Sequence, residues 1–248
     1  MTTPSFVGAG TPIHDGGSTW PTSLTITTSD LPTGISSGHR LLIVFSFSRH
    51  TTNAVIVDYS DLTDAGYVLT AAAFSGSSPR SQLVVYSGEY DAADFPMTVT
   101  STADASDLYP GDWRIDTIAY TQSSEITVTD DEGNANDPYV PTLNPTAGVL
   151  TTALSTVVQV VHVAKQDVGS ILYANGMTER FRSAALTSRG GGVITLDRAD
   201  VPASTNVDYA QVGVTNPPSG WTSNAATTVQ LQMVGTVVSG WGVNTINW

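Results

Sequence analysis

The chain has 248 residues, of which 40% are hydrophobic and 12% are charged, with a net charge of −13 and no cysteine. This hydrophobic content supports a folded core and argues against disorder, and the negative charge argues against a role in binding nucleic acid. The composition also excludes disulfides and thiolate metal sites, and no run of about 18 apolar residues is present to cross a membrane.

The first half of the sequence predicts a series of short β-strands. Residues 1–21 are rich in glycine and proline and are expected to form an N-terminal arm. The most apolar run of the chain begins at Leu41, and Ile43, Phe45 and Phe47 continue one face of a period-2 pattern, which is typical of a central strand. The second face of this run turns polar at its end. Further strands are expected at 24–28, 54–58, 67–74, 83–90, 97–101, 113–121 and 126–128.

The acidic segment 130–137, DDEGNAND, is predicted to be a loop that joins two halves of one sandwich. A boundary between two smaller units is the alternative, but the two halves show no convincing sequence repeat. The β-branched segment 157–165 predicts a strand rather than a helix. Shorter strands are expected at 149–154, 171–173, 177–182, 192–197 and 207–215.

The segment 227–234 has the cleanest alternation in the chain. Its apolar residues are predicted to face the core, while Gln230 and Gln232 are predicted to face solvent. No helix is expected except a turn near Asp200. The predicted core consists of Leu41, Ile43, Phe45, Phe47, Val85, Ile118, Val161, Val229 and Leu231.

Short, evenly spaced strands with polar turns predict an all-β fold, an antiparallel β-sandwich of jelly-roll-like type. An immunoglobulin-like domain is less consistent with the sequence, because its Cys-Trp-Cys core is absent. The predicted organisation is an arm at 1–21, a single sandwich domain at 22–235 and a C-terminal tail at 236–248.

Side chains capable of catalysis are present but form no recognisable motif. The four histidines are His14, His39, His50 and His162, and no Gly-x-Ser-x-Gly elbow accompanies them. Because His162 lies in an apolar strand, it is expected to be a core or interface histidine. We therefore expect no enzymatic activity, with a hydrolase as a minor alternative.

Two acidic groups raise the question of a metal site. Asp58, Asp61 and Asp64 form one group and the segment 130–137 forms the other, and their oxygens are the type of ligand that calcium prefers. Neither group has EF-hand spacing. Solvated loops are the preferred interpretation, calcium is the alternative, and no metal or cofactor is expected.

Several short motifs occur in a characteristic order: Phe6-Val7-Gly8-Ala9, Leu31-Pro32, Gly38, Ala119-Tyr120, Val149-Leu150-Thr151-Thr152, Met177-Thr178-Glu179-Arg180 and Trp221. This order resembles a group of all-β virion-associated proteins of tailed bacteriophages. The chain departs from the family at Gly38-His39, where Gly-Asp is usual, and at Gly66-Tyr67, where Gly-Trp is usual. The resemblance implies a non-enzymatic structural or adhesion role and carries over no catalytic residue.

The expected function is therefore that of a virion structural protein, such as a head decoration, head fibre or tail appendage subunit, assembled in the host cytoplasm. Binding to a host-surface carbohydrate or receptor is the alternative. The expected partners are other virion proteins and further copies of the chain, with a trimer favoured, and a host-surface glycan is a further candidate.

Apolar residues near both chain ends are predicted to contact a partner, because tryptophan is a frequent interface anchor. The residues chosen for this role are Phe6, Trp20, Trp241 and Trp248. In the alternative interpretation, both ends fold back onto their own sandwich as edge strands.

Overall fold

The computed structural model describes residues 2–15, 22–49, 56–74, 80–102, 112–135, 149–164, 168–184, 191–214 and 225–235. Within these residues the fold is all-β, as the sequence predicts, and every strand pair is antiparallel. In the described part of the chain, three short helical segments interrupt the strands: η1 (Thr28–Asp30), α1 (Ser60–Asp64) and η2 (Ala92–Asp94). The sequence predicts no helix except a turn near Asp200, and this prediction is wrong, because short helical segments occur here while Asp200 lies in β15 (Gly192–Val201).

The first half of the chain forms two sheets. The inner sheet has the strand order β1-β9-β4-β7-β6, with β2 also paired to β9, and the outer sheet has the order β3-β8-β5. The strands are β1 (Phe6–Ala9), β2 (Ile13–Asp15), β3 (Thr22–Ile26), β4 (Arg40–Arg49), β5 (Ile56–Asp58), β6 (Val68–Phe74), β7 (Arg80–Glu89), β8 (Met97–Thr102) and β9 (Asp112–Tyr120).

The second half also forms an inner sheet and an outer layer. The inner sheet has the order β10-β18-β12-β15-β14, and the outer layer consists of the pairs β11-β16 and β13-β17. The strands are β10 (Ser123–Ala135), β11 (Val149–Leu150), β12 (Ser155–Val163), β13 (Val168–Tyr173), β14 (Thr178–Ser183), β15 (Gly192–Val201), β16 (Asn206–Val207), β17 (Gln211–Val214) and β18 (Ala225–Gly235).

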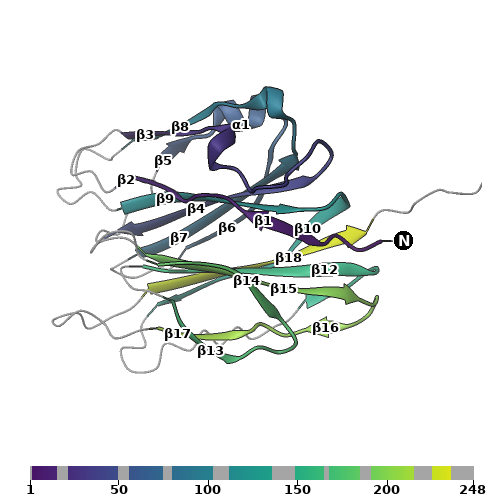
Figure 1. Cartoon of the computed structure of the whole chain (residues 1–248). Coiled ribbons are helices and arrows are strands. Elements are labelled where there is room, and N and C mark those ends of the chain that lie inside the picture. Colours follow the sequence, from purple (N-terminus) through teal and green to yellow (C-terminus); the bar gives the residue numbers. More distant parts are fainter. Residues whose placement is uncertain are drawn as a thin grey trace, which may run out of the picture.

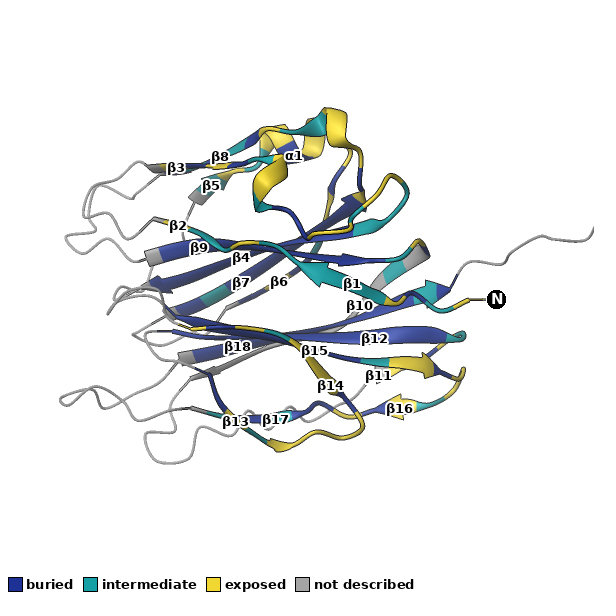
Figure 2. Ribbon diagram, viewed as in Figure 1, coloured by how far each residue is buried: buried dark blue, intermediate teal, exposed yellow. Residues whose placement is uncertain are grey.

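The sheets stack in four layers, more than the two that the sequence predicts (Figure 1). Each junction between layers has its own apolar core. Phe45 and Trp113 belong to the first core, Val44 and Val229 to the central one, and Val161 and Val212 to the third. Figure 2 shows that the two inner sheets are the most buried part of the molecule. The burial of alternate faces of β4 in two different cores makes it the central strand that its sequence predicts.

The second half repeats the strand order of the first. Strands β3, β4, β5, β6, β7 and β9 correspond to β11, β12, β13, β14, β15 and β18, because each pairs with the equivalent neighbours. The long strand β10 corresponds to β1 and β2 together, since these two pair successively with β9. Strand β8, which pairs with both β3 and β5, corresponds to the successive strands β16 and β17.

The predicted core residues are all buried, so this part of the sequence interpretation is confirmed. The prediction that Gln230 and Gln232 face solvent is wrong, because both side chains are buried beneath the outer layer of the second half. Residues 130–135 were predicted to lie in a loop, but they continue β10 and pair with β18. Within the predicted arm, residues 6–9 and 13–15 form edge strands on β9.

Candidate functional site

Six polar side chains lie together between the two inner sheets, and we call them the intersheet polar cluster. They come from β4, β7, β9, β12 and β18 and are at most 4% exposed: Ser48, Ser81, Arg114, Asp116, His162 and Thr227. Each occupies a position between the inner sheets, next to the apolar residues of the central core. The cluster is therefore the place to examine for catalytic chemistry, because it holds hydroxyl, imidazole and carboxylate groups.

His162 is bound at both ring nitrogens. Its Nδ1 forms a hydrogen bond of 2.7 Å with Ser81 Oγ, and its Nε2 forms one of 3.3 Å with Ser48 Oγ. Ser81 Oγ is also 2.7 Å from Thr227 Oγ1. A neutral imidazole has one donor and one acceptor nitrogen, and hydroxyl groups can satisfy both. Burial, with a smaller effect from the Arg114 charge, lowers the pKa of His162 to about 3.

Arg114 and Asp116 form a buried ion pair beside this histidine. Arg114 Nε donates to Asp116 Oδ2 at 2.9 Å, and Nη2 donates to Oδ1. Arg114 Nη1 donates to the backbone oxygens of Ala184, at 2.9 Å, and Gly191, at 3.3 Å. The guanidinium thus joins the first half of the chain to the second. Burial raises the pKa of Asp116, and the charge of Arg114 opposes this rise.

The cluster has the residue types of a Ser-His-Asp triad without its arrangement. In a triad, the carboxylate accepts a hydrogen bond from the imidazole, orients it and stabilises its protonated form. Here Asp116 pairs with Arg114, and a serine hydroxyl binds each nitrogen of His162. A histidine with a pKa of about 3 is also a weak general base near neutral pH. The geometry is instead that of a hydrogen-bonded contact that holds the two halves of the chain together. We call this contact the intersheet lock.

Acidification should weaken this lock. The pKa of His162 is about 3 in the folded chain and near 6.5 in an unfolded chain. The folded state therefore binds fewer protons, so the stability due to neutral His162 is complete above pH 6.5 and is lost as the pH falls toward 3. Between pH 7 and pH 5 we expect His162 to reduce the free energy of unfolding by about 2 kcal/mol. Urea denaturation at the two pH values measures this loss.

The variant His162→Gln is the control, because an amide keeps a hydrogen-bonding group without titrating. Its stability should fall between pH 7 and pH 5 by about 2 kcal/mol less than that of the wild type. Burial raises the pKa values of Asp116 and Asp197, and this partly offsets the effect of acid in both proteins. If the wild type and the variant lose equal stability between pH 7 and pH 5, the loss does not come from the titration of His162.

A second cluster lies where the edge strands β1 and β14 approach one another. The Phe6 ring packs edge to face on Tyr120, with 5.8 Å between the ring centroids, and the Arg180 guanidinium lies 5.8 Å from the centre of the Phe6 ring. Arg180 Nε donates to the buried carboxylate of Asp197 at 2.7 Å. Burial raises the pKa of Asp197, while Arg180 and then Tyr120 act against this rise.

The N-terminal backbone reinforces this edge. Thr156 Oγ1 donates to the Pro4 oxygen at 2.5 Å, and the Thr121 amide donates to the Ser5 oxygen at 2.8 Å. The Thr2 oxygen lies so close to Gly235 that a Cβ atom at position 235 would clash with it. The segment before β1 therefore contacts both halves of the chain.

Of the four predicted partner-interface residues, Phe6 lies among the described residues. Phe6 is half-buried and makes the contacts within the chain described above, so its apolar ring has neighbours in a single copy. Trp20, Trp241 and Trp248 lie outside the described residues, and their role in an interface stays a prediction. His39 lies beside Ser36, His14 is exposed on β2, and His50 is outside the described residues.

Two of the carboxylates considered as calcium ligands accept hydrogen bonds from backbone amides. Asp58 Oδ1 accepts from the Ser60 amide at 2.9 Å, and Asp61 Oδ2 accepts from the Thr98 amide at 2.9 Å. In the part of the chain that the structure describes, no group of three or more acidic, histidine or cysteine side chains is placed to hold a metal. Asn136 and Asp137 lie outside that part.

Sequence reasoning missed two features, one in the intersheet polar cluster and one beneath the outer layer of the second half. Gly191 lies against the His162 ring, and a Cβ atom at that position would clash with Nε2, which explains a glycine there. Buried glutamines are the second feature. Gln159 exchanges two hydrogen bonds with the backbone of Ala210, at 2.8 and 3.1 Å, and Gln230 Nε2 donates to the Val207 oxygen at 3.3 Å. They satisfy backbone groups at the break between β16 and β17.

Comparisons with protein-family models, curated proteins and solved structures found no match. Among the described residues, no helix has the length and apolar character needed to span a membrane.

Proposed function

We propose that this chain is a non-enzymatic structural subunit of a bacteriophage virion, a head decoration, head fibre or tail appendage protein that acts through contacts with other proteins. The observation that carries the proposal is the use of the chemically capable side chains. The serines, histidine and ion pair of the intersheet polar cluster are buried and bind one another. This arrangement holds sheets together and offers little to a substrate.

The resemblance to virion-associated proteins supports the particular role, and the layered all-β architecture agrees with it. Three separate cores distribute the apolar burial along the stack, and each half buries its inner sheet on both faces. Such a molecule can act as a rigid spacer, and its sheet edges and outer faces can contact neighbouring proteins of the particle. Assembly in the host cytoplasm followed by incorporation into the particle is part of the same proposal.

We further propose that each half is a variant of the jelly roll. In the first half, successive strands alternate between inner and outer sheets from β2 to β6, and again from β7 to β9. This winding is the support for the assignment. The hairpin β6-β7, which lies wholly in the inner sheet, is the departure that makes it a variant.

The decisive experiment is a cryo-EM map of virions from the phage that encodes the chain, combined with mass spectrometry of purified particles. We expect the protein in mature particles as ordered density on the head or tail. A deletion of residues 236–248 should keep the sandwich folded and lose attachment, because this segment holds Trp241 and Trp248. Particles that lack the protein altogether would overturn the virion role.

Recognition of a host-surface carbohydrate or receptor is the second proposal, and it is compatible with a place in the virion. A glycan array probed with the purified full chain separates the two. Specific binding to a glycan, together with loss of adsorption in particles lacking the protein, would favour adhesion. Particle instability without a change in adsorption would favour the structural role.

A further inference from the structure

The contact between the two inner sheets has two different ends, which we call the linked end and the locked end. At the linked end, β9 ends at Tyr120 and β10 begins at Ser123, so the backbone connects the two halves there. Arg40, at the start of β4, pairs with Tyr120 at this end, whereas Ser48 pairs with Ser81 near the far end of β4. The intersheet lock and the covalent connection therefore lie at opposite ends of the interface.

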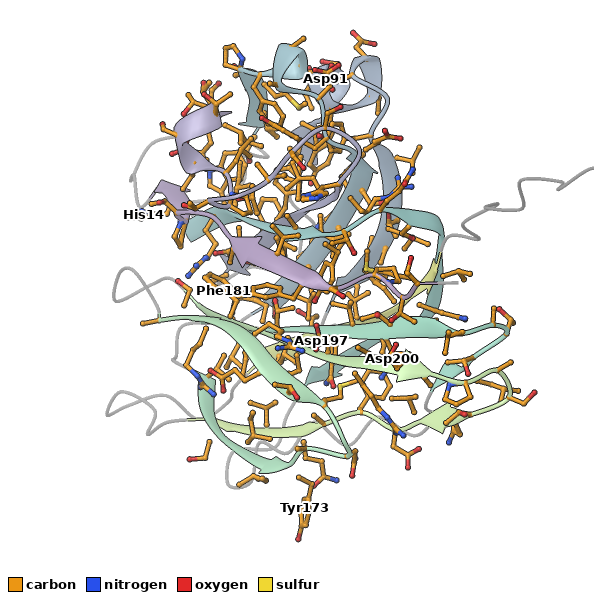
Figure 3. All side chains as sticks on the ribbon, turned by 45° about the vertical axis from the view of Figure 1, so that its right-hand side comes forward. His14, Asp91, Tyr173, Phe181, Asp197 and Asp200 are labelled. Carbon is orange, nitrogen blue, oxygen red and sulfur yellow. The ribbon has the colours of Figure 1, made fainter. Side chains whose placement is uncertain are left out.

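Hydrogen bonds strengthen the linked end. Arg40 Nη2 donates to the Ser123 oxygen at 3.1 Å, which joins the start of β4 to the start of β10. The segment before β1 contacts both halves, and its Thr3 Oγ1 also donates to Asp200, which Figure 3 shows in the second half. The arginine and backbone groups in these contacts keep their charge between pH 7 and pH 5.

The locked end depends on a histidine without an acidic partner. The hydroxyl groups of Ser48 and Ser81, both in the first half, bind the two ring nitrogens of His162 in the second half. Among the described residues, β4, β7 and β18 present hydroxyl groups to this site, and the glycine before β15 has no side chain. The charged groups come from β9, where Arg114 is paired with Asp116. A proton on His162 therefore places a second buried cation beside Arg114.

Each half has a core that does not depend on the other half. The first core consists of residues of the first half, and the third core consists of residues of the second half. The central core alone combines residues of both halves in the described part of the chain. Separation of the halves at the locked end thus exposes part of the central core and leaves the other two cores buried.

We propose that the interface between the halves is an acid-sensitive hinge, in which protonation of His162 opens the locked end while the linked end and both sandwiches stay intact. Opening lets water reach the imidazolium and relieves its repulsion by Arg114. At neutral pH the apolar burial of the central core and the intersheet lock keep the closed form dominant. The hinge is a property of the isolated chain and does not rest on the virion role.

The size of the acid effect follows from proton binding. In the open form water surrounds the ring, so the pKa of His162 is near 6.5, against about 3 in the closed form. The ratio of open to closed molecules therefore rises about 25-fold between pH 7 and pH 5. Burial raises the pKa of Asp116, which favours the closed form in acid and partly opposes the opening.

Cysteine protection measures the opening, because the chain has no native cysteine. Val193→Cys reports on the locked end, since Val193 is fully buried in the central core and pairs with His162. Ser87→Cys reports on the linked end, since Ser87 is 2% exposed and pairs with Leu42 near the start of β4. Each rate of reaction with dithiodipyridine is divided by that of the exposed Thr25→Cys at the same pH, which removes the titration of the thiol itself.

At pH 5 the relative rate of Val193→Cys should exceed that of Ser87→Cys at least about tenfold, because the locked end opens without global unfolding. The rate at position 193 should also depend only weakly on urea, since partial opening exposes little surface. Equal rates at the two positions with a steep dependence on urea would show that acid unfolds the whole chain. That result would overturn the hinge.

The dependence on His162 is tested in the same assay. The relative rate of Val193→Cys should rise about 25-fold from pH 7 to pH 5, and His162→Gln should abolish this rise, because glutamine does not titrate. A rise of the same size in the His162→Gln background would refute the role of the histidine. Ala73→Cys, a buried site of the first half near the same end, should behave like Val193→Cys and provides the test if Val193→Cys does not fold.

Discussion

Arg114→Met should destabilise the protein by about 3–5 kcal/mol, because it leaves the carboxylate of Asp116 buried without its partner. The carboxylate is fully buried, and the backbone oxygens of Ala184 and Gly191 lose a donor at the same time. Urea denaturation at pH 7 measures the loss. Since typical domains are stable by only 5–15 kcal/mol, a loss of this size removes a large fraction of the free energy of unfolding.

The double variant Arg114→Met/Asp116→Leu separates the buried charge from the packing. It removes both charges, so most of the lost stability should return. The deficit of Arg114→Met alone should also shrink at low pH, because a buried carboxyl with a raised pKa is stable once it is protonated. Arg198→Met, which changes a half-exposed arginine, should cost less than about 0.5 kcal/mol. If the double variant is as unstable as Arg114→Met, the loss of stability is due to altered packing and not to the buried charge.

Phe45→Ala should cost about 3–5 kcal/mol, as expected for the loss of a buried phenyl ring. The ring is fully buried and belongs to the first core. It packs edge to face on Tyr59 and Tyr86, with centroid distances of 5.0 and 6.1 Å. The neighbouring strands are fixed by ladders on both sides of β4 and cannot collapse into the space.

Phe45→Leu provides the comparison, because leucine retains most of the apolar volume and should cost roughly 1–2 kcal/mol. Guanidinium denaturation followed by tyrosine and tryptophan fluorescence measures both variants. A loss below about 1 kcal/mol for Phe45→Ala would mean that the ring is not part of a tightly packed core.

Sequence periodicity predicted the strands well because most of them are buried on at least one face. The alternation in β4 and the β-branched run in β12 each produced a strand near the expected position. Periodicity could not reveal the number of layers. Ser46 and Ser48 were read as a polar face, yet both are buried against the second inner sheet. A face of small hydroxyl residues is compatible with solvent or with a neighbouring sheet, and local sequence does not distinguish the two.

The polar site was even less predictable, because its members come from distant parts of the chain. Ser81 and His162 are 81 positions apart, and His162 and Ser48 are 114 apart. The histidine was expected to be a core or interface residue, and its burial agrees with the first of these. Its partners depend on the register of two sheets packed face to face. The repeated strand order was equally hidden, because the two halves share topology without a visible sequence repeat.

That repeated order has a consequence for the history of the molecule. Duplication and fusion of a gene for a half-length polypeptide would leave two equivalent sandwiches joined by a short link, here between Tyr120 and Ser123. In such an ancestor the central core, with Val44 on one side and Val229 on the other, would have been a homodimer interface. Fusion would have made that association permanent and left each copy free to diverge, so that the outer layer of one half now carries hydroxyl pairs and that of the other exposes Leu172 and Tyr173. A half-length relative, if found, should dimerise through its inner sheet.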